Sequence, residues 1–360
     1  MADIRDVALD AGVSIATVSR VFSGSAVVAS ATREAVLASA ERLQYRADAG
    51  ARSLRTRRTM TIGLIVGDIL NPFFTELARA VEEEARRHGY LVIIGNSAED
   101  PQAQQDYLTN LLERRVDAII LSPTRDPAPG LAQTLRSHPA AILLDRRLPD
   151  PVPSDEELAD DGLPELRCVS VDGTDAIDEL AADLALSGYR RPAIISGPTA
   201  ISTGRERLDA FAAACRRYGL ELQPERIFEG DFQADSGRRG MAALLAHRPD
   251  CVFIADNLMA LGALDELGQR GLRYPDDLGL AVYDDVPWFR HTASPMTVIS
   301  QPVAELGRQA VRAALRRLEV APPHQPDVPP SSDLPEPQLH ATLVRRSSLN
   351  PVHAPKEVEK

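Results

Sequence analysis

The first 45 residues contain three short stretches in which apolar side chains recur every three or four positions, the spacing of one face of a helix. Gly12 separates the first two stretches, and Asp3 and Ser14 stand where the N-terminal caps of two helices are expected. The apolar positions of the three predicted helices are Ile4, Val7 and Ala8; Val18, Val21 and Phe22; and Val36, Leu37, Ala40 and Leu43. Three amphipathic helices of this length can close one small core.

The first two helices and their turn have the pattern of a helix-turn-helix. Ala8 is small where two helices must cross closely, Gly12 allows the turn, and Val13 points back into the core. An ordinary helical hairpin would show the same spacing, but without this combination of a small residue, a turn glycine and a polar outer face. The outward positions of the second helix suit a DNA major groove, and they are Ile15, Ala16, Thr17, Ser19 and Arg20.

Beyond residue 60 the pattern changes to short apolar runs that alternate with helical stretches. Residues 60–66 are almost continuously apolar, which is typical of a strand buried on both faces of a parallel sheet. Further predicted strands lie at residues 90–94, 118–121, 142–144, 168–171, 193–196, 226–228, 251–254, 278–283 and 338–346. Because about 280 residues exceed one comfortable core, the pattern predicts two α/β lobes with doubly wound parallel sheets. Ligands bind at the carboxyl ends of the strands in such folds.

Net charge separates the chain into a basic head and an acidic body. Residues 1–60 contain nine Arg against six Asp and Glu, a net charge of +3, although the whole chain of 360 residues carries −12. Binding to DNA by counterion release needs only local positive charge. A charged run is usually a solvated surface, but here five Arg between residues 46 and 58 directly follow the predicted helix-turn-helix. The distribution favours a DNA-binding head.

The motifs of the head resemble those of the lactose-repressor (LacI/GalR) family of transcription regulators. The matching motifs are Asp6-Val7-Ala8, Ala11-Gly12-Val13-Ser14, Thr17-Val18-Ser19-Arg20-Val21, Thr32-Arg33-Glu34 and Leu43-Gln44-Tyr45. The resemblance implies DNA contacts of two kinds, to base edges by Ile15, Ala16 and Arg20, and to the backbone by Ser14, Thr17, Ser19 and Arg33. It also implies that Leu54 enters the minor groove from a hinge helix formed on DNA.

The body resembles the periplasmic-binding-protein-like effector domain of the same family. Among the matching motifs are Asn71-Pro72-Phe73-Phe74-Thr75-Glu76, Asp145-Arg146, Glu206-Arg207, Gly230-Asp231-Phe232 and Tyr283-Asp284-Asp285. Several acidic residues follow predicted strands, so their carboxylates should converge on one cleft. Carboxylates, an arginine and aromatic faces suit a sugar or a nucleoside. The expected effector contacts are Phe73, Phe74, Asp145, Thr203, Arg207, Phe232, Asp256, Asn257 and Asp284.

The sequence therefore predicts a repressor of carbohydrate uptake or catabolism genes, gated by a sugar between two lobes. A regulator that responds to a nucleoside or purine corepressor is the alternative, since departures from the family pattern at Gly173, Ile201 and Asn257 leave the effector class open. A sugar-binding protein without gene control would share the two-lobed fold, but it would begin with a signal peptide rather than a helix-turn-helix. An enzyme could use Asp284 and Asp285 as acid and base, yet no phosphate loop, nucleophile elbow or metal-spaced His cluster accompanies them.

Four segments are expected: a helix-turn-helix head at residues 1–46, a hinge at 47–59, a two-lobed ligand-binding and dimerisation domain at 60–348, and a disordered tail at 349–360. A homodimer is expected, because one small head makes few contacts and two-fold operators match two-fold proteins. Cys168, Cys215 and Cys251 predict free thiols in a reducing compartment. No stretch reaches 18 apolar residues. A cytoplasmic protein with no membrane partner, metal or cofactor is expected.

Overall fold

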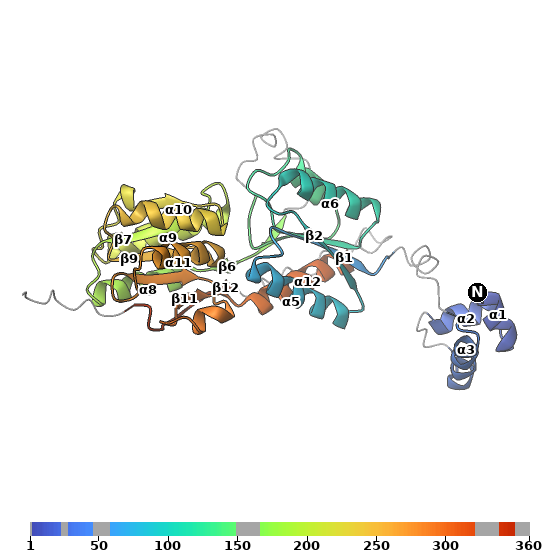
Figure 1. Cartoon of the computed structure of the whole chain (residues 1–360). Coiled ribbons are helices and arrows are strands. Elements are labelled where there is room, and N and C mark those ends of the chain that lie inside the picture. The colour runs from blue at the N-terminus through green and yellow to red at the C-terminus, as the bar shows by residue number, and fades with distance from the viewer. Residues whose placement is uncertain (1, 23–27, 46–57, 149–165, 321–337, 350–360) are drawn as a thin grey trace, which may run out of the picture. The chain divides into compact units, whose positions relative to one another are not determined.

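The computed structural model describes residues 2–22, 28–45, 58–148, 166–320 and 338–349 of the chain (Figure 1). The chain divides into two compact units, Met1–Met60 and Thr61–Lys360. Among the described residues, the first unit contains only helices, and the second contains all of the strands. This division agrees with the change of hydrophobic pattern near residue 60.

The first unit is a three-helix head formed by α1 (Ile4–Asp10), α2 (Ile15–Phe22) and α3 (Ser30–Arg42). Asp3 begins α1 with a capping box, in which its side chain accepts from the Asp6 N–H and the Asp6 side chain accepts from the Asp3 N–H at 2.8 Å. Gly12 has φ +65°, a conformation that favours glycine, and it makes the turn between α1 and α2. The buried core consists of Val7, Ala8, Val18, Val21, Val36 and Ala40.

One predicted core position of the head is wrong. Leu37 is 48% exposed, whereas Ser39 on the same helix is completely buried. Ser39 Oγ donates to Asp10 Oδ2 at 2.5 Å, which fixes α3 against the end of α1. The inner face of α3 therefore follows Val36, Ser39 and Ala40, and Leu37 lies beside it rather than on it.

The first lobe of the second unit is a five-stranded parallel sheet in the order β2-β1-β3-β4-β5. Its strands are β1 (Thr61–Val66), β2 (Leu91–Asn96), β3 (Ala118–Leu121), β4 (Ala141–Leu144) and β5 (Arg167–Val169). Helices α5 (Pro72–Arg87) and α12 (Val303–Val320) cover one face, and α6 (Pro101–Glu113) and α7 (Leu131–Ser137) cover the other. The predicted strand at residues 90–94 is the edge strand β2, and its Leu91, Ile93 and Ile94 are 75%, 39% and 45% exposed.

The second lobe is a six-stranded sheet in the order β13-β11-β10-β9-β7-β8. Its strands are β7 (Pro192–Ser196), β8 (Ile227–Glu229), β9 (Cys251–Ile254), β10 (Gly279–Tyr283), β11 (Thr297–Ser300) and β13 (Thr342–Val344). One buried cluster packs under α10 (Ala234–Leu245) and α11 (Asn257–Gln269), and another packs under α8 (Thr174–Leu186) and α9 (Ser202–Arg217). The sheet is parallel except for β13, which runs antiparallel to β11.

Two short connections between the lobes lie within the described residues. One connection joins β5 to β6 (Val171–Asp172), and the other joins β11 to α12, which packs on the first lobe. The predicted last strand at residues 338–346 is instead two strands, because β12 (Leu339–His340) pairs with β6 and only β13 joins the second sheet. In the described part of the chain, no helix is long and apolar enough to cross a membrane.

Candidate DNA-contacting helix and interlobe cleft

Helix α2 carries most of the residues predicted to contact DNA. Ser14 caps this helix, since its Oγ accepts from the Thr17 N–H at 3.2 Å and lies 2.9 Å from Thr17 Oγ1. Ile15 is 47% exposed although it is large and apolar, so it can reach a thymine methyl in a major groove. Ala16 and Arg20 are also exposed. The helix thus has the short outward face that a recognition helix needs.

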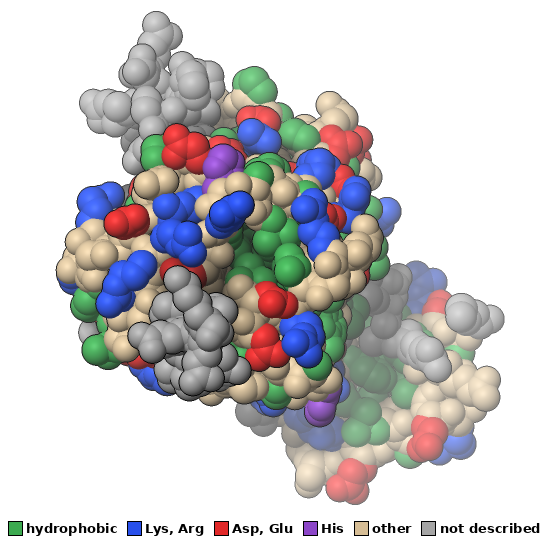
Figure 2. Space-filling view, turned by 60° about the vertical axis from the view of Figure 1, so that its left-hand side comes forward, with side chains coloured by type: hydrophobic (Ala, Val, Ile, Leu, Met, Phe, Trp, Pro, Cys, Tyr) green, Lys and Arg blue, Asp and Glu red, His purple; other side chains and the backbone are tan. Residues whose placement is uncertain are grey.

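The remaining predicted DNA contacts have different surroundings. Ser19 on α2 and Arg33 on α3 are half-buried. Leu54 lies outside the described residues. On the face of the second unit shown in Figure 2, the described Asp, Glu and Arg side chains are interspersed instead of forming one continuous basic area. Phosphate binding needs concentrated positive charge, so this face does not compete with the head as a DNA-binding surface.

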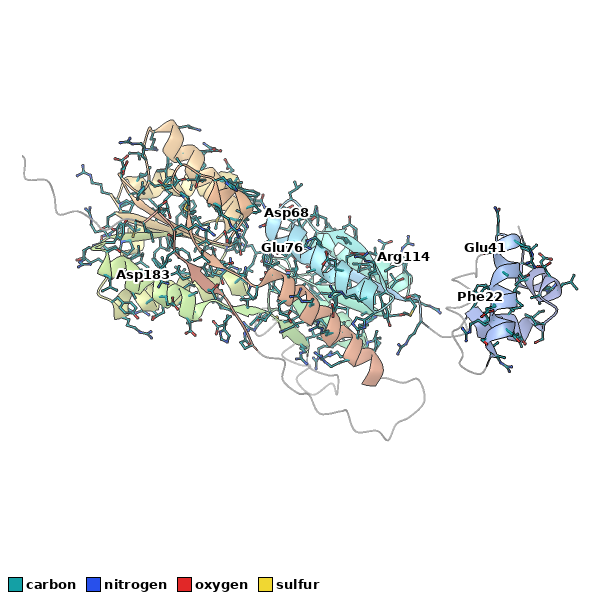
Figure 3. The ribbon with its side chains drawn as sticks, turned by 90° about the horizontal axis from the view of Figure 1, so that it is seen from below. Phe22, Glu41, Asp68, Glu76, Arg114 and Asp183 are labelled. Atoms are coloured by element: carbon teal, nitrogen blue, oxygen red, sulfur yellow. The ribbon has the colours of Figure 1, made fainter. Side chains whose placement is uncertain are left out.

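The predicted effector residues of the body meet where strands of the two lobes end. Asp145 directly follows β4 of the first lobe, and Asp256 and Asp284 follow β9 and β10 of the second. Phe73 and Phe74 come from the first turn of α5, which begins next to the loop that contains Asp68. Figure 3 shows Asp68 at the end of the first lobe that borders the second lobe, whereas Arg114 lies at the opposite end. The rule that ligands bind at the carboxyl ends of parallel strands therefore predicted where these residues meet.

Direct hydrogen bonds join the two lobes across this cleft. Asn71 accepts from Asn257 Nδ2 through its Oδ1 at 2.9 Å, and Asn71 Nδ2 donates to Asp256 Oδ2 at 3.3 Å. Asn257 Nδ2 also lies 3.3 Å from Asp284 Oδ2, and Gln301 Nε2 donates to Asp284 Oδ1 at 2.7 Å. We call Asn71, Asp256 and Asn257 the interlobe bridge. It holds the lobes together through their own side chains.

Three of the predicted effector residues have left-handed backbone conformations. The φ angles are +67° at Asp145, +64° at Phe232 and +79° at Asp284. Residues other than glycine adopt this region at a cost, and such strain concentrates at functional sites. The strained conformation turns each of these chain segments sharply at the cleft.

Burial changes the acidity of two carboxyl groups in the cleft. Burial raises the pKa of Asp145 to about 6, although Arg146 and Arg207 oppose the shift. Burial and the nearby charge of Asp284 raise the pKa of Asp256 to about 7. At neutral pH the Asp256 carboxyl therefore exists in both protonation states, and it can donate or accept a hydrogen bond.

Arg207 forms a fixed wall in the middle of the cleft. Its Nη1 donates to the Ala255 carbonyl at 2.8 Å, and its guanidinium carbon lies 3.6 Å from the centre of the Tyr283 ring. Arg207 is 9% exposed, and Thr203, one turn earlier on α9, is 8% exposed. Because a guanidinium has five donors in a planar fork, Arg207 still has donors for a ligand.

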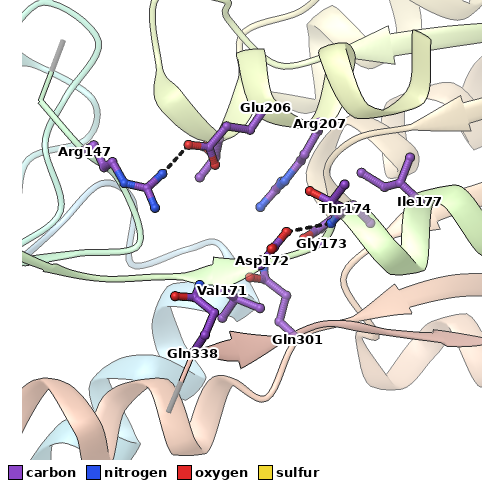
Figure 4. A pocket seen from close by; sticks show the side chains of 12 residues that line it. Arg147, Val171, Asp172, Gly173, Thr174, Ile177, Glu206, Arg207, Gln301 and Gln338 are labelled. Atoms are coloured by element: carbon purple, nitrogen blue, oxygen red, sulfur yellow. Dashed lines mark hydrogen bonds and ion pairs between the residues drawn. The ribbon is translucent and has the colours of Figure 1, made fainter. Parts of the chain in front are cut away.

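The larger open space lies beside the connections between the lobes. This hinge-side cavity has a volume of about 450 Å³ (Figure 4), within the range of about 300–1,000 Å³ that is common for small-molecule sites. Thr203 and Arg207 were predicted to contact an effector and line it. The prediction missed other polar lining residues, which are Arg147, Asp172, Thr174, Glu206, Tyr283, Gln301 and Gln338. Figure 4 shows Arg147 and Glu206 as an ion pair at one side of the cavity.

Apart from Asn257, the rest of the predicted residues surround a much smaller space of about 20 Å³. The guanidinium carbon of Arg146 lies 5.6 Å from the ring centre of Phe74 and 5.4 Å from that of Phe232. We call the space between these two rings the aromatic slot. Phe73 is buried and packs edge-on against Phe74, with ring centres 5.1 Å apart. Asn257 Nδ2 donates to two residues that line this space, Asn71 and Asp284.

Comparisons with known proteins agree with both units. Residues 59–339 match the family described as periplasmic binding proteins and sugar binding domain of LacI family. Residues 3–48 match the lacI family of bacterial regulatory proteins. The chain belongs to the LacI family. This confirms the resemblance that the motifs of the head and the body indicated.

Individual LacI-family relatives cover nearly the whole chain. The HTH-type transcriptional repressor CytR of Escherichia coli K12 is 32% identical over 320 residues, which are 88% of this chain and 90% of that protein. The ribose operon repressor of the same organism is 33% identical over 322 residues, 88% and 93% of the two chains. The Lac repressor dimer bound to operator and the anti-inducer ONPF has a similar fold, with a TM-score of 0.79, 24% identity and 97% and 99% coverage.

As a member of the LacI family, the chain is a DNA-binding transcriptional regulator and not an enzyme. LacI-family repressors bind operator DNA and a small-molecule effector, and they form dimers. The helix-turn-helix head matches the DNA-binding part of the family, and the two-lobed α/β body matches its ligand-binding part, so the two binding functions belong to separate units. The predicted function class and fold class are confirmed.

Proposed function

We propose that this regulator is a homodimeric repressor of genes for carbohydrate uptake or catabolism, and that a sugar or sugar derivative between its lobes sets its affinity for the operator. The observation that carries this proposal is the hinge-side cavity of about 450 Å³. Its lining combines the donors of Arg207 with acceptors on Asp172 and Glu206. Sugar hydroxyls are both donors and acceptors, so they pair well with such a mixed lining.

The cavity also adjoins the connections that a movement of the lobes would bend. Asp172 belongs to β6, directly after the first connection, and Gln301 lies in the second connection. A ligand that contacts both connections binds with different strength as the angle between the lobes changes. Differential binding of this kind shifts the population of lobe arrangements. In a dimer, that shift changes how well two heads fit the two half-sites of an operator.

The surface proposed for dimerisation is the edge of the first-lobe sheet. Leu91, Ile93 and Ile94 are exposed apolar residues on the edge strand β2. An uncovered apolar edge strand favours association with another chain. A second copy of this chain covers such an edge in a closed two-fold dimer and leaves no edge free for further growth.

The DNA contacts that we propose are those of the recognition helix and its neighbours. Ile15 and Ala16 make apolar contacts with base edges, and Arg20 supplies the polar base contact. Contacts to the DNA backbone come from Ser14, Thr17, Ser19 and Arg33, and Leu54 enters the minor groove. Because operator DNA is in the cytoplasm of a bacterial cell, we propose that the protein works there.

The proposal is tested by fluorescence anisotropy with the full chain. The protein is titrated onto DNA from its own promoter and onto a scrambled duplex at one fixed salt concentration. The titration is repeated with a panel of sugars and nucleosides. We expect preference for the promoter and its loss in the presence of one sugar. Equal affinity for both duplexes, or operator affinity that no compound changes, would contradict the proposal.

A nucleoside effector is the second candidate. Phe74 and Phe232 face a common space from opposite lobes, and a flat base could stack between two such rings. The same panel distinguishes the two classes, because only one class should change the affinity for the promoter at micromolar concentration.

A further inference from the structure

Both arginines that line the hinge-side cavity already have anionic neighbours. Arg147 forms an ion pair with Glu206, and their side chains are 52% and 50% exposed. Arg207 lies in the electrostatic field of Asp284 and Asp145, and its Nη1 donates to the Ala255 carbonyl at 2.8 Å. Neither cation is therefore free of other charges to receive an anionic ligand.

Asp172 adds a further negative charge to the cavity lining. Its Oδ1 accepts from the Thr174 N–H at 2.9 Å. Hydrogen bonds from the backbone and the hydroxyl of Thr174 hold the pKa of Asp172 below its ordinary value, so this carboxyl is ionised at neutral pH. The charges of the described lining residues Arg147, Arg207, Asp172 and Glu206 sum to zero. The lining thus offers hydrogen-bonding groups without a surplus of positive charge.

The ion pair of Arg147 and Glu206 joins the two lobes (Figure 4). Arg147 lies in the loop after β4 of the first lobe, and Glu206 lies on α9 of the second. The Arg147 N–H donates to Ser202 Oγ at 2.9 Å, one turn before Glu206 on the same helix. Arg147 Nη2 also donates to Ser170 Oγ at 3.3 Å. The backbone and the side chain of Arg147 are both held, and Glu206 receives its guanidinium.

A phosphate group in this cavity would meet an unfavourable balance of charge. A phosphate monoester carries about −1.5 to −2 charges at neutral pH. A ligand that fills the cavity displaces water, and charges interact more strongly when water is displaced. The phosphate could take Arg147 only by leaving Glu206 without its cation and beside a second anion. A neutral polyhydroxyl compound leaves the ion pair intact.

We propose that Glu206 makes the hinge-side cavity selective for uncharged polyhydroxyl compounds, because it holds Arg147 and so excludes phosphorylated sugars. This inference rests on the proposed function, since it assumes that a sugar enters this cavity. It assigns to one carboxylate the distinction between a sugar and the phosphate ester of the same sugar.

The test frees Arg147 without changing the size of its partner. Glu206→Gln removes the negative charge, and the double variant Glu206→Gln/Arg147→Gln also removes the cation. The matched control is Glu83→Gln, which removes the same charge from an exposed ion pair with Arg79 on α5, 2.8 Å long. Because the pair of Arg147 and Glu206 is half-exposed, its removal should change stability little. Circular dichroism and thermal melting of the full chain establish that each variant is folded.

Isothermal titration calorimetry compares ribose, glucose and fructose with ribose 5-phosphate, glucose 6-phosphate and fructose 6-phosphate. For the sugar that binds most tightly, we expect the wild type and Glu83→Gln to bind the ester at least tenfold more weakly than the sugar. In Glu206→Gln the ratio of ester affinity to sugar affinity should rise at least tenfold, and the double variant should lose this rise. A smaller difference in the wild type, a smaller rise in Glu206→Gln, or a tenfold rise that persists in the double variant would overturn the proposal.

Inorganic phosphate tests the same point without a sugar. We expect Glu206→Gln to bind phosphate at least tenfold more tightly than the wild type, Glu83→Gln and the double variant, because only Glu206→Gln has an arginine released from its carboxylate. A smaller gain in phosphate affinity would count against the role of Glu206.

Operator binding measured on the same samples separates this inference from the proposed function. If no sugar changes operator affinity but Glu206→Gln still gains phosphate binding through Arg147, the proposed sugar control fails and the role of Glu206 stands. If a sugar releases the operator but Glu206→Gln gains neither ester nor phosphate affinity, the proposed function stands and the role of Glu206 is refuted.

Discussion

Replacing Asp256 with Asn should stabilise the protein at alkaline pH. Burial, together with the charge of Asp284, raises the pKa of Asp256 from 3.8 to about 7 in the folded state. Between these two pH values the folded protein binds one more proton than the unfolded chain, so the free energy of unfolding falls as pH rises. At about 1.36 kcal/mol per unit of pKa, the ionised carboxylate costs about 4 kcal/mol above pH 7. An amide cannot ionise and avoids this cost.

The replacement of Asp256 by Asn also removes one hydrogen bond. As the cap of α11, Asn at position 256 can still accept from the Met259 N–H through Oδ1, a bond of 2.9 Å. Its amide nitrogen would face Asn71 Nδ2, which now donates to Asp256 Oδ2, and one lost hydrogen bond costs about 1 kcal/mol. The net gain from Asp256→Asn is therefore about 3 kcal/mol at pH 8.5, and less than about 1 kcal/mol at pH 5, where most of the penalty is absent.

Urea unfolding of the full chain, followed by circular dichroism between pH 5 and pH 8.5, measures this difference. The matched control is Asp285→Asn. Burial acts to raise the pKa of Asp285, but hydrogen bonds from Arg346 and Arg290 hold it below the ordinary value. Asp285 is thus ionised throughout the range, and its replacement should destabilise by a constant amount. An advantage of Asp256→Asn that fails to grow with pH would refute the reasoning.

Four further outcomes test other parts of the molecule. Arg20→Ala should lower operator affinity at least tenfold in anisotropy titrations without changing effector binding; retained preference for operator would remove Arg20 from base recognition. Arg207→Ala should weaken effector binding at least tenfold by calorimetry, and unchanged affinity would mean that the site lies elsewhere. Gly173→Asn should lower the melting temperature, because its Cβ would lie 2.3 Å from Tyr283 Oη, and adding Tyr283→Phe should recover part of the loss. Leu91→Glu should shift the protein from dimer to monomer in light scattering, whereas a persistent dimer would place the interface away from β2.

Much of the cleft could be predicted because topology determines it. Asp145, Asp256 and Asp284 stand at the ends of apolar runs, and parallel strands bring their carboxyl ends to one edge of each sheet. The helix-turn-helix was equally clear, since Gly12 and the caps at Asp3 and Ser14 act locally. The caps and the turn of the head depend on residues close together in the sequence.

Features that depend on distant packing could not be predicted. Gln301 and Asp172 line the hinge-side cavity only because separate connections between the lobes lie beside it. Gly173 departs from the common family residue because a Cβ at this position would collide with the hydroxyl of Tyr283. Tyr283 is 110 positions away in the chain. Strand β11 was missed, although it forms the bridge between β10 and β13. Leu37 was misplaced because Ser39 takes the buried position through a bond to Asp10.

The interlobe bridge has a consequence for how the response could be adjusted during evolution. Asn71 links the lobes directly through Asn257 and Asp256, so these side chains contribute to the free energy of lobe closure independently of the effector's own contacts. The apparent affinity of an effector depends on the fraction of molecules already in the competent arrangement. A substitution at Asn71 would therefore change the effector concentration at which genes respond and leave the contacts that recognise the effector intact. The effector concentration at half-response and the identity of the effector can thus be inherited as separate traits.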